Sequence, residues 1–169
     1  MGTGIQLPPL PTPPANVKSA PYVAVVSPWL LAVISAMAPI SVGNHTTMLV
    51  VPIVLSRDRM DVVTERHEAI HVWQMIECSV VGLALAASVA ALDPVAGVVL
   101  AILAVIPYGY VFWMIYLGSF LFNWFVLRMT AAGSYYEVVF EREAYTHASD
   151  PEYLRGRRWF AWLGGRDAG

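Results

Sequence analysis

The stretch HEAIH at positions 67 to 71 contains residue types whose spacing could support catalysis. If it is helical, His67 and His71 lie one turn apart, about 40° from each other around the axis, so both imidazoles can reach one metal ion. Glu68 lies about 100° from His67, beside such an ion, where a carboxylate can accept a proton from an activated water molecule. Zinc is the metal typical of such histidine and carboxylate ligands. The sequence therefore predicts a zinc site with His67 and His71 as ligands and Glu68 as general base.

Two residues continue the same helical face, Gln74 and Cys78. Gln74 could form a hydrogen bond next to the metal ligands, or it could simply pack against a neighbouring helix. Cys78 is the chain's single cysteine, which excludes an intrachain disulfide, and we expect it to be a small buried apolar residue.

A third ligand is expected from the polar segment after residue 133. This segment offers four candidates, namely Glu137, Glu141, Glu143 and His147. On a continuous helix Glu137 shares the face of Glu141, whereas Glu143 points about 200° away and His147 about 240° away. Ala144 flanks the Glu141 face and would let the HEAIH helix approach closely. Glu141 is therefore the predicted third ligand.

The composition indicates a membrane protein. Of the 169 residues 57% are hydrophobic and only 13% are charged, and the mean hydropathy is +0.59. Soluble domains are about a quarter charged. The net charge of -2 and the absence of a long basic run exclude a nucleic-acid surface. We therefore predict the lipid bilayer as a partner and no nucleic acid.

The apolar and polar stretches divide the chain into one domain with two tails. A proline-rich flexible tail is predicted over 1–20, a single membrane-embedded domain over 21–163, and a second tail over 164–169. Within the domain we expect an apolar segment over 22–42 that crosses or dips into the membrane, and a short β-strand over 46–56. Three helices should follow: the HEAIH helix over 60–92, a return helix over 95–128 that is kinked or divided near Pro107 and Gly109, and the third-ligand helix over 134–148. The predicted fold class is mainly α, a membrane-embedded helical hairpin with a short β-strand.

The hairpin also predicts an orientation. All nine arginines lie on one side of it, and none lies at the Asp93-Pro94 turn. By the positive-inside rule, the HEAIH end faces the cytoplasm. The alternative, a soluble domain with a buried hairpin, would need more polar chain to cover the apolar runs than this sequence contains.

HEAIH, followed by EREAY at 141–145, resembles the gluzincin arrangement, in particular the membrane-embedded zinc peptidases related to the CAAX prenyl protease and the bacterial heat-shock membrane protease. Tyr145 stands where that group's second motif has an aspartate. Residues 41–74, FEREAY at 140–145 and RRWFAWL at 157–163 also resemble small peptidase-like proteins of bacteria and phages. The resemblance covers roughly residues 41–163.

The resemblance implies a minimal zincin-like active site on this fold, in a bacterial inner-membrane or phage-encoded protein. Glu141 would be a metal ligand, Glu68 the general base, and Tyr145 a candidate donor to the oxyanion, with Tyr135, Tyr136 and His147 as alternatives. The expected partner is a peptide or protein substrate. A different interpretation is a non-enzymatic membrane protein in which the metal only ties two helices together. The oligomeric state and the identity of the substrate are not determined by the sequence.

Overall fold

The computed structural model describes residues 23–26, 46–50, 53–56, 60–105 and 109–164. The described part is mainly helical, as predicted. Three short strands come first, β1 Val23–Val26, β2 Thr46–Val50 and β3 Ile53–Ser56. They are followed by α2 Val62–Ala90, α3 Pro94–Val105, α4 Tyr110–Leu121, a π-helical turn Phe122–Val126, α5 Ala131–Tyr136, α6 Val139–His147, α7 Tyr153–Gly156 and a 3-10 turn Ala161–Leu163.

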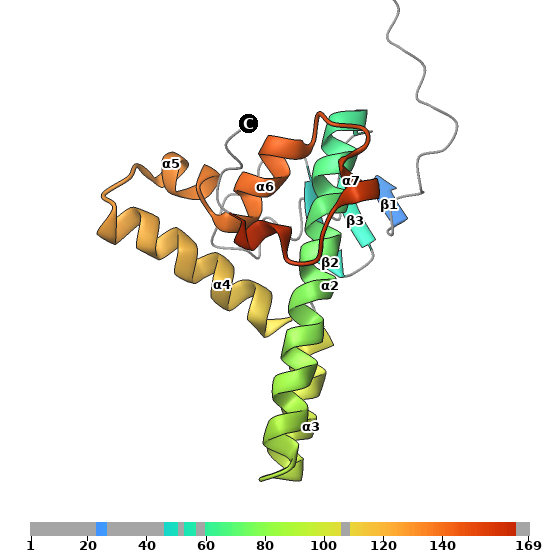
Figure 1. Ribbon diagram of the computed structural model, residues 1–169, viewed down its shortest axis with the longest axis vertical. Helices are drawn as coiled ribbons and strands as arrows, with labels where there is room; N and C mark the ends of the chain where they lie inside the picture. The colour runs from blue at the N-terminus through green and yellow to red at the C-terminus, as the bar shows by residue number, and fades with distance from the viewer. Residues whose placement is uncertain (1–22, 27–45, 51–52, 57–59, 106–108, 165–169) are drawn as a thin grey trace, which may run out of the picture.

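Helix α2 is the long axis of the molecule and carries the HEAIH residues in its first third (Figure 1). Its start is fixed by Asp61, whose carboxylate accepts a hydrogen bond from the Thr64 amide at 2.7 Å. Glu65 in the first turn also suits the positive end of the helix dipole. The helix agrees closely with the range predicted from the sequence, 60–92.

The far half of α2 and helix α3 form a two-helix stem that projects from the rest of the protein (Figure 1). Asp93 caps α3 by accepting hydrogen bonds from the amides of Val95 and Ala96 at 3.0 and 3.1 Å. The helices pack so closely that a Cβ atom added at Gly97 would come within 2.5 Å of the Cα atom of Ala90. The turn between the two helices therefore lies at Asp93-Pro94, where the sequence predicted it.

The single return helix predicted over 95–128 is replaced by two helices and a π-helical turn. Helices α3 and α4 are bent by 68° across a break that includes residues 106–108, which lie outside the described residues. Gly109 directly follows the break and has a φ of 59°, a conformation that favours glycine. This division was anticipated from Pro107 and Gly109. Helix α4 leaves the stem and runs toward α5 (Figure 1).

The predicted third-ligand helix, 134–148, is also divided. Helix α5 ends at Tyr136 and α6 begins at Val139, because Val138 takes an extended backbone conformation. The amide of Val139 donates to the Ser119 hydroxyl of α4 at 3.3 Å. Contact with α4 thus stabilises a break between α5 and α6 that the local sequence does not predict.

The strands form one sheet in the order β1-β3-β2. Strand β3 pairs in parallel with β1 and antiparallel with β2, and the register shifts between Met48 and Val50. Where one strand was predicted over 46–56, the structure has two, β2 and β3. Strand β1 lies within the predicted apolar segment 22–42. The rest of that segment, beyond residue 26, lies outside the described residues, as do the predicted tail 1–20 and all of the predicted tail 164–169 except residue 164.

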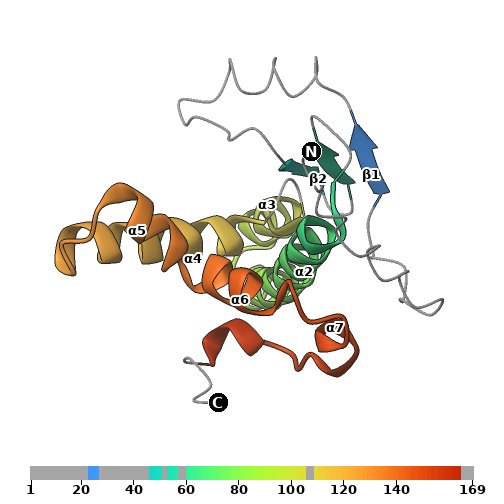
Figure 2. The same cartoon turned by 90° about the horizontal axis from the view of Figure 1, so that it is seen from above.

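The head of the molecule, formed by the first half of α2 with α4, α6 and the C-terminal turns, has an apolar core. The core residues are Met75, Cys78, Val111, Phe112, Val138, Phe140 and Trp162. Phe112 of α4 stacks on Phe140 of α6 with ring centroids 4.4 Å apart. Seen from above, α6 lies next to α2, and this core holds the two helices together (Figure 2). Cys78 is buried here, as expected from its small apolar side chain.

Candidate metal centre

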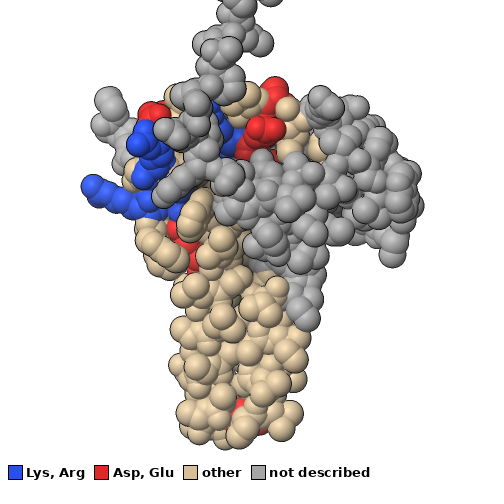
Figure 3. All heavy atoms as spheres, turned by 90° about the vertical axis from the view of Figure 1, so that its right-hand side faces the viewer, with Lys and Arg blue, Asp and Glu red and all other residues tan. Residues whose placement is uncertain are grey.

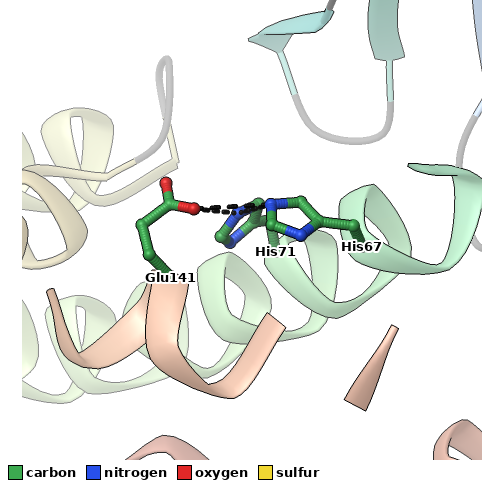
Figure 4. A group of neighbouring side chains, drawn as sticks. All are labelled: His67, His71 and Glu141. Carbon is green, nitrogen blue, oxygen red and sulfur yellow. Dashed lines mark hydrogen bonds and ion pairs between the residues drawn. The ribbon is translucent and has the colours of Figure 1, made fainter. Parts of the chain in front are cut away.

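His67, His71 and Glu141 meet between α2 and α6, and each offers one ligand atom to the same point (Figure 4). The Nε2 atoms of the histidines are 3.0 Å apart. The Oε2 atom of Glu141 lies 3.4 Å from Nε2 of His67 and 3.5 Å from Nε2 of His71. Residues separated by 70 positions in the sequence are therefore brought together as the helix geometry predicted.

These distances suit one tetrahedral ion. Ligand atoms about 2.0 to 2.1 Å from a tetrahedral zinc ion lie about 3.3 Å from one another, by simple geometry. The edges formed by the two imidazole nitrogens and the carboxylate oxygen are 3.0, 3.4 and 3.5 Å. The residues present thus fit a metal ion without rearrangement of the backbone.

The hydrogen bond to Gln74 selects the tautomer of a neutral His71. The amide nitrogen of Gln74 donates to the Phe140 carbonyl at 3.0 Å and to Oε2 of Glu143 at 2.9 Å. Its oxygen therefore faces Nδ1 of His71, at 2.7 Å, and accepts a hydrogen bond from it. A neutral His71 that donates through Nδ1 has its lone pair on Nε2, the atom that points at His67 and Glu141. The structure thus shows Gln74 hydrogen-bonded to one of the predicted ligands.

The two oxygens of Glu141 have different surroundings. Oε1 accepts a hydrogen bond from the Tyr116 hydroxyl of α4 at 3.0 Å. Oε2 is buried and, among the described residues, receives no hydrogen bond of good geometry, which is the state expected of an atom prepared for a metal. Burial alone would raise the pKa of this carboxyl, but His71 and His67 outweigh it and hold the pKa well below its usual range. Glu141 is therefore an anion at neutral pH.

The two residues assigned to catalysis lie beside this cluster. Glu68 is buried, 6% exposed, on the turn of α2 that carries both histidines. Tyr145 is half exposed and packs its ring edge-on against His67, with centroids 4.5 Å apart. Burial raises the pKa of the Tyr145 phenol, and the carboxylates of Glu141 and Glu68 add to this effect. Tyr145 therefore stays a neutral hydrogen-bond donor at neutral pH.

The alternative ligand candidates are placed elsewhere, whereas the alternative tyrosines lie next to Tyr145. Glu137 ends α5, so it does not share a helix with Glu141. His147 stacks on Tyr153 with ring centroids 3.9 Å apart. Tyr135 and Tyr136 pack edge-on around Tyr145, with centroids 6.5 and 5.0 Å from it. The tyrosines thus form an aromatic rim beside the cluster.

Two sets of contacts at the site were missed by reasoning from the sequence. One is the Tyr116 hydroxyl on Glu141, which comes from a helix that reads as a uniform apolar run. The other is a buried ion cluster of Glu77, Glu143 and Arg157, whose side chains are 1%, 4% and 4% exposed. Glu77 did carry a signal, because it is the single charge between residues 72 and 92. A lone carboxylate in an apolar run needs a buried partner.

The arrangement can hold one divalent ion with two imidazoles and a carboxylate, next to a second carboxylate and a phenol. Three protein ligands leave a position for water or substrate, which is typical of catalytic zinc sites. No model of a known protein family, no curated protein and no solved structure matches this chain.

Proposed function

We propose that this protein is a membrane-bound zinc metallopeptidase that hydrolyses peptide bonds near the cytoplasmic face of the membrane. The observation that supports it most directly is the convergence of three ligand atoms from His67, His71 and Glu141, with distances close to the edges of a zinc tetrahedron. Glu68 is held beside this cluster by the same helix. A site that only stabilises structure would not need this second carboxylate.

In this proposal the chain's own groups perform the proton transfers. Zinc, when bound, would supply a Lewis acid that polarises the scissile carbonyl and lowers the pKa of water. Glu68 accepts the proton of the attacking water at its carboxylate and delivers it to the leaving amine. Tyr145, as a neutral phenol at the rim, is placed to donate a hydrogen bond to the developing oxyanion. Gln74 keeps the lone pair of His71 directed at the metal.

The membrane part of the proposal is supported by the stem. Helix α2 is long and apolar enough to cross a bilayer, and α3 with α4 and the π-helical turn would pass the same test as one bent segment. Large apolar side chains on the stem are solvent-exposed in the isolated chain: Leu83, Leu85, Leu92, Val95, Val98, Val99, Ile102, Leu103 and Val105. In water such a continuous apolar surface would be unfavourable, and lipid would cover it.

The charge distribution supports the proposed orientation. In the view of Figure 3, the arginine atoms of the described residues lie on the head, and the stem shows no charged atoms until acidic atoms at its tip. The tip turn contains Asp93, which caps α3. The arginines of the described head, such as Arg66 and Arg155, lie at the same end of α2 as the metal cluster. By the positive-inside rule this end faces the cytoplasm.

A second candidate is a metal-stabilised membrane protein without catalytic activity. It is favoured by the burial of two of the proposed ligands, since His71 is 7% and Glu141 is 5% exposed. A metal at this position would join α2 to α6 and so cross-link the head. The two functions differ in what they require of Glu68, because only a peptidase needs a general base.

The test compares Glu68→Gln with wild type in detergent-purified protein and in proteoliposomes. The amide cannot accept the proton, so we expect one zinc ion per chain to be retained while cleavage falls by about 10² to 10⁴. Cleavage is measured by mass spectrometry as new N-termini in a membrane-protein extract incubated with the proteoliposomes. Glu65→Gln, an exposed change one turn earlier on α2, is the matched control and should leave both zinc and cleavage unchanged. Full cleavage by Glu68→Gln would exclude the catalytic assignment and leave the structural role of the metal.

A further inference from the structure

The buried ion cluster connects the C-terminal segment, residues 157–163, to the head. Arg157 donates from Nη2 to Glu77 at 3.2 Å and from Nε to Glu143 at 2.6 Å. Glu77 also accepts hydrogen bonds from the Phe160 amide and from the indole of Trp162, both at 2.9 Å. One guanidinium thus pairs with two buried carboxylates, one on α2 and one on α6. Such a fork fixes both the distance and the plane of its partners.

The cluster is linked to the metal centre through one amide. Glu143 accepts from Arg157 at both oxygens, since Nη2 also approaches its Oε2 at 3.3 Å. The same Oε2 accepts from the side-chain nitrogen of Gln74 at 2.9 Å. The oxygen of Gln74 in turn accepts from Nδ1 of His71 at 2.7 Å. A continuous chain of hydrogen bonds therefore runs from Arg157 to the proposed metal ligand His71.

Each group in this series of hydrogen bonds restricts the orientation of the next group. The fork of Arg157 holds the Glu143 carboxylate in one plane, and that plane presents Oε2 to Gln74. With Glu143 in place, the Gln74 amide has its nitrogen toward Glu143 and its oxygen toward His71. If the carboxylate turned, the Gln74 nitrogen would keep only the Phe140 carbonyl as an acceptor, and the acceptor for Nδ1 of His71 would be held less firmly. Groups that orient a metal-binding histidine through its second nitrogen typically change metal affinity 10-fold to 100-fold.

We propose that Arg157 is a positioning residue for the metal ligand His71, acting through Glu143 and Gln74, so that the hydrogen bonds of its guanidinium to Glu143 set the metal affinity of the site. This inference rests on the metal site of the proposed function but does not depend on catalysis. The side-chain hydrogen bonds of Arg157 go to Glu77, Glu143 and the Arg158 carbonyl, and Gln74 stands between it and His71 in the chain of hydrogen bonds. Its effect on the metal would therefore be indirect.

The test measures zinc affinity by competition with a chelator, in detergent, at a temperature below the melting of every variant. Arg157→Lys keeps the charge but lacks the planar fork, and we expect zinc affinity to fall 10-fold to 100-fold. Gln74→Leu breaks the link to His71 and should give a similar loss. Because both changes interrupt one path, the double variant should lose no more than the larger single loss. Trp162→Phe is the matched control, since it removes a hydrogen bond to Glu77 and leaves Glu143 and Gln74 in place.

Trp162→Phe should lower the melting temperature, because the C-terminal segment is held less firmly. It should change zinc affinity less than twofold, because Arg157, Glu143 and Gln74 keep their hydrogen bonds. If Arg157→Lys does not fold, Tyr153→Phe replaces it, because the Tyr153 hydroxyl donates to Oε1 of Glu143 at 2.9 Å. That variant should lower zinc affinity about three-fold to ten-fold, the lower part of the range for supporting groups. Folded Arg157→Lys or Tyr153→Phe protein with wild-type zinc affinity would overturn the inference, and so would additive losses. Wild-type protein that binds no zinc would instead refute the metal site of the proposed function.

Discussion

The hydroxyl of Tyr116 is the most direct support for the proposed third ligand, and Tyr116→Phe removes it without changing the shape of the ring. The hydroxyl donates to Oε1 of Glu141 at 3.0 Å, so Oε2 is the oxygen left to face the histidines. A hydrogen bond to a charged group contributes about 1.5 to 3 kcal/mol. A tenfold change in an equilibrium constant corresponds to about 1.4 kcal/mol. If the zinc-bound protein loses the free energy of this hydrogen bond, zinc affinity therefore falls roughly 10-fold to 100-fold.

Helix α4 also provides the matched control, Tyr110→Phe. The Tyr110 hydroxyl donates to the backbone carbonyl of Gly82 at 3.3 Å. This bond joins neutral groups and is expected to contribute about 0.5 to 1.5 kcal/mol to stability. We expect both variants to melt at a lower temperature than wild type, and only Tyr116→Phe to lose zinc affinity. The assay is chelator competition on detergent-purified protein. Equal zinc affinities for Tyr116→Phe and Tyr110→Phe would refute the role given to the hydroxyl on Glu141.

Three further predictions concern the third ligand and the stem. Glu141→Gln should lose stoichiometric zinc, measured by elemental analysis, whereas Glu137→Gln should retain it, because Glu137 ends a different helix; the reverse result would reassign the ligand. The pKa of Glu141 is lowered in the folded protein, so in metal-free protein its stabilising effect is complete above about pH 4.5 and is lost as the pH falls further. The gap in unfolding free energy between wild type and Glu141→Gln should therefore shrink below that pH, and a gap that widens would contradict the assigned shift. Gly97→Ala should lower the melting temperature because its Cβ would overlap Ala90, and Gly118→Ala, with no atom within 4 Å of its Cβ, should not.

The order of the elements around the HEAIH motif could be predicted because it depends on local rules. A capping aspartate, helix-forming residues and no proline until Pro94 specify α2, and the period of 3.6 residues places His67 and His71 on one face. Pro94 and Gly109 mark where the backbone cannot continue as the same helix. These properties require only neighbours in the sequence.

The choice of Glu141 over Glu143 could also be made from helix periodicity, since two residues along a helix point to nearly opposite sides. The structure agrees on the separation, because Glu141 faces the histidines and Glu143 faces Arg157. The assignment of Glu141 as a zinc ligand stays a prediction. The same periodicity misplaced Glu137, because contact between Val139 and Ser119 stabilises a break that no local pattern marks.

Only the tertiary structure decides which groups, distant in the sequence, form hydrogen bonds and ion pairs with the buried carboxylates. The sequence shows Glu77 as an isolated carboxylate in an apolar run, and burial of a charge requires a partner. It does not show that the partner is Arg157, 80 residues later, or that Tyr116 meets Glu141. These pairs depend on how α4, α6 and the C-terminal segment pack against α2, which is set by the shape of the apolar core around Phe112 and Phe140. Spacing along the chain therefore determines which residues can bind a metal, and packing between helices determines which residues hold those ligands in place.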